Sequence, residues 1–147
     1  PTLGHEWLIK TAQKSFDVEV TIAENPDKKS LFTFDERKDM FEHAIPGIKV
    51  TSFVKEFTVD YAKKNNISVL IRGIRNTTDF AYEQMIYNIN KQMDPELETF
   101  FLLPEKSLGE VSSSVVKSML GIHSWEDRVK PFVNPYVLEK LKEKVNK

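Results

Sequence analysis

Residues 67–104 read ISVLIRGIRNTTDFAYEQMIYNINKQMDPELETFFLLP, and the fold class can be inferred from them. The two ends, ISVLIRG at 67–73 and ETFFLLP at 98–104, are near-continuous apolar runs, which are typical of strands buried on both faces. Between them, residues 78–93 have the periodicity of a helix whose apolar stripe contains Tyr82, Ile86, Ile89 and Met93. A strand, a helix and a second strand in this order predict a βαβ unit with parallel strands.

The rest of the chain continues this alternation. Two further strands are expected at 16–23 and 48–53, and Asp35 is the expected cap of the helix that follows it. The other helices are expected at 4–15, 57–66, 113–121 and 135–145. The sequence therefore predicts an α/β fold with a parallel sheet flanked by helices, in a single domain over residues 1–147. Its C-terminal segment, from about 122 to 147, is expected to be helical.

Composition excludes several classes of function. The 147 residues include 21 Lys and Arg against 22 Asp and Glu, so the net charge of −1 leaves no basic excess for nucleic acid. The absence of Cys excludes disulfides, thiolate metal sites and Cys nucleophiles. No apolar run approaches the roughly 20 residues that span a bilayer. No metal-ligand spacing is found either, and a cytoplasmic location with no membrane partner is expected.

Two clusters of phosphate-binding residue types occur in the first 30 residues. Thr2, Gly4 and His5 stand at a predicted helix start, where free N–H groups and the helix dipole favour anions. In the alternative interpretation, Thr2 only caps the helix and His5 has no role. Lys28 and Lys29 follow a predicted strand, where flexible ammonium groups suit phosphate, although a solvated turn would have the same composition.

The most specific cluster follows the buried strand at 67–73. Arg72 and Arg75 flank a glycine there, and guanidinium groups match phosphate oxygens in pairs. Asp79 and Glu83 lie one turn apart on the next helix and could orient the arginines or reach a ribose or amine. The alternative is a salt-bridge network in which the two carboxylates simply neutralise the two arginines.

A fourth cluster, Ser112 to Ser114, again lies between a buried strand and a helix. Its hydroxyl and N–H groups suit a triphosphate, and a run of capping serines is the alternative. Because the carboxyl ends of parallel strands share one rim of the sheet, the clusters are expected to form one site. None of them contains an activated nucleophile, so the chemistry expected is positioning and charge stabilisation of phosphate groups.

Four motifs therefore occur in order: TLGH at 2–5, NPDKK at 25–29, RGIRNTTDFAYE at 72–83 and SSSVVK at 112–117. Together they closely resemble the phosphopantetheine adenylyltransferases, a bacterial family of coenzyme A synthesis within the nucleotidylyltransferase superfamily. The arginine motif followed by ETFFL is highly specific for that family. The TLGH element marks only the wider superfamily.

The resemblance implies a Rossmann-like domain that joins the adenylyl group of ATP to 4′-phosphopantetheine, with Mg²⁺ as cofactor and a homohexamer as the assembly. It implies that His5 stabilises the transition state and contacts ATP. It also implies that Lys28, Thr58 and Arg72 bind phosphopantetheine. The other ATP contacts that it implies are Gly73, Ile74, Arg75, Glu83, Leu108, Gly109, Glu110, Val111, Ser112, Ser113 and Ser114.

The sequence departs from the family at its start. The family has a strand and a Gly-x-Phe-Asp-Pro-type loop directly before TLGH, and this sequence contains neither. We expect the native protein to possess both, and we expect unpaired sheet edges where this central strand would lie. Two other functions stay open. One is a nucleotidylyltransferase for nicotinate mononucleotide or a phosphoalcohol, and the other is a non-catalytic nucleotide-binding remnant.

Overall fold

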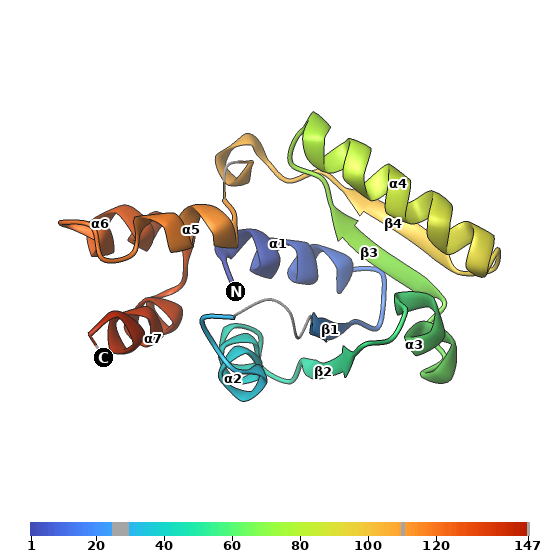
Figure 1. Cartoon of the computed structure of the whole chain (residues 1–147), viewed down its shortest axis with the longest axis horizontal. Coiled ribbons are helices and arrows are strands. Elements are labelled where there is room, and N and C mark those ends of the chain that lie inside the picture. The colour runs from blue at the N-terminus through green and yellow to red at the C-terminus, as the bar shows by residue number, and fades with distance from the viewer. Residues whose placement is uncertain (25–29, 110, 147) are drawn as a thin grey trace.

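The computed structural model describes residues 1–24, 30–109 and 111–146, in which helices and strands alternate (Figure 1). In chain order the elements are α1 (Leu3–Ala12), β1 (Glu19–Glu24), α2 (Phe34–Ala44), β2 (Lys49–Val54), α3 (Thr58–Lys64), β3 (Val69–Gly73), α4 (Thr77–Met93), β4 (Glu98–Leu102), the 3₁₀ turn η1 (Lys106–Leu108), α5 (Ser113–Met119), α6 (Trp125–Val129), the 3₁₀ turn η2 (Lys130–Phe132) and α7 (Pro135–Val145). The α/β fold class is confirmed, and the architecture is Rossmann-like.

The strands form two parallel pairs. β1 pairs with β2, with Glu19 opposite Lys49, and β3 pairs with β4, with Val69 opposite Glu98. Within the described residues these pairs are separate two-stranded sheets, because no strand joins β1 to β3. The parallel direction was predicted correctly, whereas a continuous sheet is not observed. β1 and β3 are therefore not paired with each other among the described residues, which agrees with the expectation of unpaired strand edges.

Helix α1 touches both pairs of strands (Figure 1). Ile9 packs in a cluster with Phe41 of α2 and Val50 of β2. On the other side, the Leu8 side chain fills the space beside Gly73 at the end of β3. This packing places the N-terminus of α1, which carries the TLGH motif, at the carboxyl end of β3.

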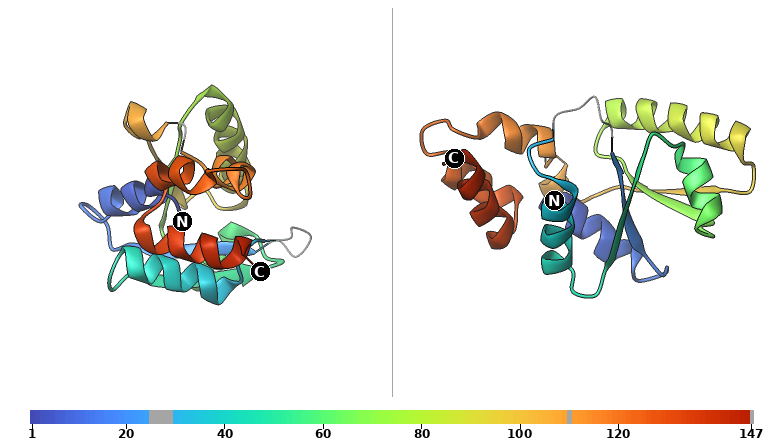
Figure 2. Two further views of the ribbon diagram at one scale, coloured as in Figure 1. Left: turned by 90° about the vertical axis from the view of Figure 1, so that its left-hand side faces the viewer. Right: turned by 60° about the horizontal axis from the view of Figure 1, so that its bottom comes forward.

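The C-terminal helices gather at one end of the molecule (Figure 2). Trp125 and Val129 of α6 and Leu141 of α7 share a buried cluster with Met40 of α2 and Val116 of α5. Trp125 is therefore a packing residue of this cluster. The cluster attaches the last helices to α2 and to the helix that carries the serine motif.

The expected cap of α2 is wrong. Thr33, two residues before Asp35, occupies the N-cap position, and its hydroxyl accepts a hydrogen bond from the Glu36 backbone N–H at 3.2 Å. The Glu36 carboxylate in turn accepts from the Thr33 backbone N–H at 2.7 Å. This reciprocal pair leaves Asp35 inside the first turn, where its charge favours the helix dipole.

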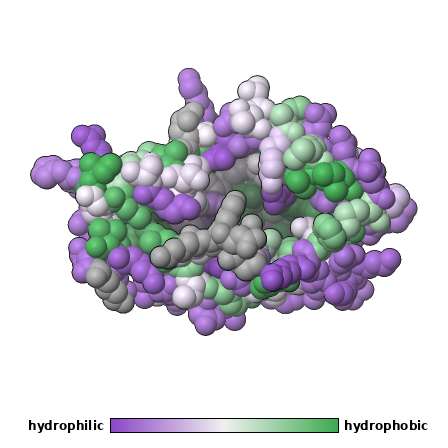
Figure 3. All heavy atoms as spheres, viewed as in Figure 1, coloured by the Kyte–Doolittle hydropathy of each residue, from purple (hydrophilic) through white to green (hydrophobic). Residues whose placement is uncertain are grey.

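Helix α4, with 17 residues, covers the β3–β4 pair. Its side toward the strands includes Glu83 and Tyr87, and the Tyr87 ring meets Phe101 edge to face at 6.1 Å. The apolar stripe instead lies largely outside, with Tyr82, Ile89 and Met93 exposed by 56%, 45% and 43%. In Figure 3 hydrophobic residues also gather on the part of the surface where Figure 1 places α4. No helix in the described ranges combines the length and the apolar character needed to cross a bilayer.

Candidate active site

A cavity of about 370 Å³ opens where β3 ends, among the start of α1, the first turns of α4 and the segment before α5. The molecule is hollowed near the centre of the face shown in Figure 3. The cavity brings together ten of the residues predicted from the sequence: His5, Arg72, Gly73, Arg75, Glu83, Leu108, Val111, Ser112, Ser113 and Ser114. Three of the four phosphate-binding clusters therefore meet at one site, and its volume suits a small-molecule ligand.

Other predicted residues lie elsewhere. Ile74 is buried, and its N–H donates to the Leu102 carbonyl at 3.0 Å. Thr58 is exposed at the first residue of α3 and does not line the cavity. Gly109 caps η1 and is also absent from the lining. Lys28 and Glu110 lie outside the described residues.

Sequence reasoning missed several lining residues, namely Trp7, Leu8, Ile71 and Pro104, whereas Thr2 and Gly4 belong to the first phosphate-binding cluster expected from the sequence. Two of these residues could have been identified from the sequence. Ile71 alternates with Gly73 along the strand and so shares its face. Pro104 directly follows a predicted buried strand, at the rim where ligands bind. Trp7 and Leu8 carried no comparable signal, because helical periodicity does not distinguish a pocket wall from a core.

His5 stands in the first turn of α1 with one ring nitrogen engaged. Its Nδ1 accepts a hydrogen bond from the Thr2 backbone N–H at 3.1 Å and lies 2.8 Å from the Thr2 hydroxyl oxygen. Burial lowers the pKa of His5 from 6.5 to about 4, and the positive charge of Arg75 acts in the same direction. The ring still meets solvent in the open cavity, which weakens this effect. The direction of the shift keeps His5 neutral near pH 7.

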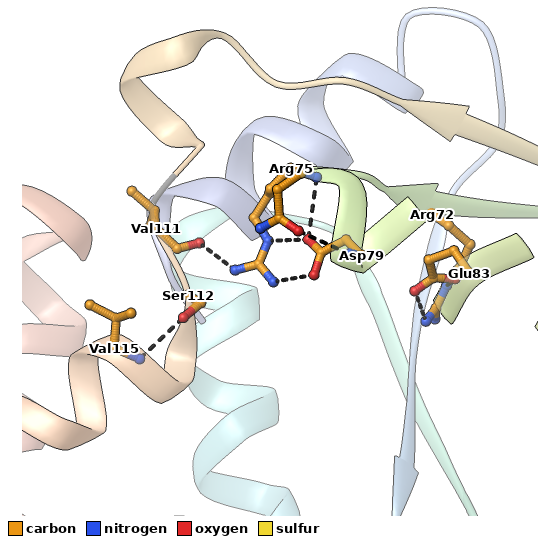
Figure 4. A network of polar contacts seen from close by, with 8 residues as sticks. Arg72, Arg75, Asp79, Glu83, Val111, Ser112 and Val115 are labelled. Atoms are coloured by element: carbon orange, nitrogen blue, oxygen red, sulfur yellow. Dashed lines mark hydrogen bonds and ion pairs between the residues drawn. The ribbon is translucent and has the colours of Figure 1, made fainter. Parts of the chain in front are cut away.

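Arg72 points from the end of β3 toward α4, where Glu83 holds it (Figure 4). Its Nε donates to Glu83 Oε2 at 2.8 Å and its Nη2 donates to Oε1 at 2.7 Å. The Arg72 side chain is 47% exposed and that of Glu83 only 11%. These bonds raise the pKa of Arg72 above its ordinary value. Arg72 is thus fixed in orientation while still open to a ligand.

Arg75 connects α4 to the segment before α5 (Figure 4). Its Nε and Nη2 donate to the two carboxylate oxygens of Asp79 at 2.8 and 3.1 Å, and its Nη1 donates to the Val111 carbonyl at 3.3 Å. The salt-bridge network considered as an alternative is therefore present. It does not remove the arginines from the site, because both still line the cavity.

The serines divide into a cap and two exposed residues. Ser112 accepts a hydrogen bond from the Val115 N–H at 3.1 Å and caps α5, so the capping interpretation holds for this serine. Ser113 and Ser114 are exposed and line the cavity. The start of α1 lies close by, since a side-chain carbon on Gly4 would stand 3.5 Å from the Val111 carbonyl oxygen. Donors from α1 and α5 therefore share one space.

The side chains that line this site include several hydrogen-bond donors. Arginine N–H groups, exposed serine hydroxyls and one imidazole face the cavity, whereas the nearby carboxylates Glu83 and Asp79 are each engaged by an arginine. Among the described residues, no three His, Asp or Glu side chains are grouped closely enough to hold a metal ion. The arrangement is suited to anionic groups such as phosphates.

Comparison with known proteins agrees with this chemistry. Residues 1–119 match the family model described as cytidylyltransferase-like. The chain is 39% identical to the phosphopantetheine adenylyltransferase of Neisseria meningitidis serogroup C (strain 053442), over 96% of this chain and 85% of that protein. It is 41% identical to the one of Dictyoglomus thermophilum (strain ATCC 35947 / DSM 3960 / H-6-12), over 97% and 87%, respectively. It is 35% identical to the one of Chromobacterium violaceum (strain ATCC 12472), over 95% and 88%.

Proposed function

Because the chain belongs to the phosphopantetheine adenylyltransferase family, within the cytidylyltransferase-like proteins, we propose that it transfers the adenylyl group of ATP to 4′-phosphopantetheine. The products are dephospho-coenzyme A and pyrophosphate. The observation that carries the proposal is the meeting of His5, Arg72, Arg75 and the exposed serines at one cavity. A site built from donors of this kind favours a reaction between two phosphorylated substrates.

The reaction is a direct displacement. A phosphate oxygen of 4′-phosphopantetheine forms a bond to the α-phosphorus of ATP, and the bond from that phosphorus to the bridging oxygen of pyrophosphate breaks. Pyrophosphate leaves with the electron pair. The attacking oxygen is already anionic, so no general base is needed. Holding both substrates in attack geometry is worth about 7–11 kcal/mol, and one well-placed donor about 3–4 kcal/mol.

In this reaction the side chains of the site bind different parts of the two substrates. Arg72 binds the phosphate of phosphopantetheine, with Lys28 and Thr58 as further contacts of that substrate. Arg75 and the serines bind the phosphates of ATP. His5 donates a hydrogen bond to the phosphate that gains negative charge in the transition state. Glu83 orients Arg72, and this role is supported by the two bonds between them.

We propose Mg²⁺ as the cofactor, bound together with ATP. In nucleotide sites this ion is held mainly by phosphate oxygens and water, with one or two carboxylates at most. The residues around the cavity fit this arrangement, because Glu83 and Asp79 are engaged by arginines and leave the phosphates as ligands. When bound, the ion neutralises part of the phosphate charge.

We also propose that copies of the chain assemble, as a homohexamer, in the cytoplasm. The exposed apolar stripe of α4 supports an assembly, since Tyr82, Ile89 and Met93 lie on one side of the helix and are each more than two-fifths exposed. Large exposed apolar patches commonly mark contacts between proteins.

Release of pyrophosphate by the purified chain tests the proposed activity. ATP and Mg²⁺ are supplied with 4′-phosphopantetheine, nicotinate mononucleotide or a phosphoalcohol as acceptor. We expect release only with 4′-phosphopantetheine, and a His5→Ala variant should lose most turnover while binding both substrates. Preference for another acceptor would overturn the substrate assignment. ATP binding without any turnover would favour the non-catalytic alternative.

A further inference from the structure

Thr2 presents two hydrogen-bonding groups to the same ring nitrogen of His5. Its backbone N–H donates to Nδ1 at 3.1 Å, and its hydroxyl oxygen lies 2.8 Å from that atom. Thr2 is only 2% exposed, so water competes little for either group. Because a backbone N–H can only donate, Nδ1 must offer its lone pair.

This contact determines where the imidazole proton lies. A neutral imidazole carries one proton, so an accepting Nδ1 leaves the proton on Nε2. The Thr2 hydroxyl can rotate and serve as a second donor to Nδ1. In the described part of the chain the side-chain hydrogen bonds of His5 involve only Nδ1, and the residue is exposed. Nε2 is therefore accessible from the cavity that His5 lines.

We propose that Thr2 is a positioning residue that holds His5 in its Nε2–H tautomer, so that a neutral N–H donor faces the bound phosphates. This inference rests on the proposed function for its catalytic consequence, but the tautomer itself belongs to the free protein. In the opposite tautomer, Nε2 would present a lone pair to an anion, and the contact would be repulsive. Thr2 thus selects the only neutral form of His5 that can stabilise negative charge on a phosphate.

A spectroscopic measurement tests the tautomer without any substrate. In ¹⁵N-labelled free protein near pH 7, nitrogen chemical shifts and couplings to ring protons distinguish a protonated from an unprotonated ring nitrogen. A His5→Gln variant assigns the signals. We expect the proton on Nε2 in the natural chain and in Thr2→Ser. In Thr2→Val, which keeps the backbone N–H but loses the hydroxyl as a second donor, we expect the Nε2–H form to remain the major one, with a measurable fraction of the Nδ1–H form. A proton on Nδ1 in the natural chain would overturn the proposal.

Kinetics separate positioning from a merely structural role. Loss of one hydrogen bond of ordinary strength corresponds to a fall of about three- to ten-fold in kcat for Thr2→Val. The KM values for both substrates should stay the same, and Thr2→Ser should restore kcat. Thr33→Val is the matched control, because it removes a threonine hydroxyl from the N-cap of α2 and is expected to lower stability without altering kcat.

The outcomes distinguish this inference from the proposed function. If the natural chain does not catalyse adenylyl transfer, the proposed function fails while the ring-nitrogen signals still decide the tautomer. If the chain is active but Thr2→Val keeps both the tautomer and kcat of the natural chain, the role of Thr2 is wrong. A loss of kcat in Thr33→Val equal to that in Thr2→Val would also overturn it, because helix capping would then explain both.

Discussion

Glu83 and Arg72 are joined by two hydrogen bonds of 2.7 and 2.8 Å, in which the carboxylate is buried and the guanidinium is half exposed. The Glu83 carboxylate therefore holds the Arg72 guanidinium in place, and the exposed part of the guanidinium can still contact a ligand. Removing the arginine entirely would leave the largely buried Glu83 carboxylate without its partner, which would lower stability as well as binding. A substitution of Arg72 that keeps its positive charge tests substrate binding with less effect on stability.

Arg72→Lys keeps the positive charge and removes the planar fork. We expect the KM for 4′-phosphopantetheine to rise about ten- to hundred-fold, since a charged hydrogen bond is worth about 1.5–3 kcal/mol. The KM for ATP and kcat should change little, as measured by varying each substrate separately. Arg37→Lys is the control, because Arg37 pairs with Glu24 at 2.9 Å outside the cavity. A rise confined to the KM for ATP would contradict the assignment of Arg72.

Asp79→Asn should weaken ATP binding through Arg75. The amide retains one acceptor but loses the charge that holds Nε and Nη2 of Arg75. We expect about a three- to ten-fold rise in the Kd for ATP, measured by calorimetry. Asp35→Asn removes the same charge from the first turn of α2 and should leave the Kd unaltered. An unchanged Kd in Asp79→Asn would show that Arg75 needs no partner.

The stability of the protein should depend on the titration of His5. The pKa of His5 is lowered from 6.5 to about 4 in the folded chain, mainly by burial, so the folded state binds fewer protons than the unfolded state. Its contribution to stability is complete above pH 6.5 and is lost as the pH falls toward about 4. Urea unfolding of the natural chain should thus weaken more steeply over this range than that of His5→Asn. Parallel pH profiles would contradict the shift.

Asn134→Asp should destabilise the protein although aspartate caps helices well. Asn134 accepts from the Val137 N–H at 2.9 Å and donates to the Glu6 carboxylate at 2.5 Å. The aspartate keeps the first bond but places a second negative charge beside Glu6, which is 7% exposed. We expect a loss of about 1–3 kcal/mol in urea unfolding. Adding Glu6→Gln should recover most of it, and a loss that this second change leaves intact would place the cause in the helix cap.

The proposed assembly should depend on the α4 stripe. Ile89→Lys places a charge in the middle of this stripe, whose members are 43–56% exposed at Tyr82, Ile89 and Met93. Because interface centres tolerate unpaired charge poorly, we expect a lower mass in size-exclusion chromatography with light scattering. Ile122→Lys is the control, since Ile122 is 60% exposed and lies outside the stripe. An unchanged mass in Ile89→Lys would exclude α4 from the interface.

The βαβ unit was predictable because its signals are local. The buried strands are continuous apolar runs, and their parallel direction follows from the helix between them. The residues at which strands begin and end were harder to predict. Phe16 was expected in β1 but lies before it, and its ring packs on Phe100 with centroids 5.5 Å apart. Alternation of apolar residues does not show that an aromatic ring packs beyond the end of a strand.

The site was partly predictable for the same reason. Arg72 and Arg75 could be identified because they follow a strand whose end lies at the rim of the sheet. Periodicity also identified the stripe of α4 but could not show that Ile89 stays exposed, because a pattern marks a face without showing what covers it. The contact of Thr2 with Nδ1 of His5 depends on rotamers, which no spacing in the sequence specifies.

The bond between Asn134 and Glu6 also has a consequence for biosynthesis. These residues are 128 positions apart, and the ribosome makes α1 among the first segments of the described chain. Glu6 also pairs with Lys10 at 3.5 Å, but it lacks its bond to Asn134 until residue 134 has been translated. A nascent chain arrested before residue 134 would therefore hold α1, whose first turn lines the cavity, without this bond to the N-cap of α7.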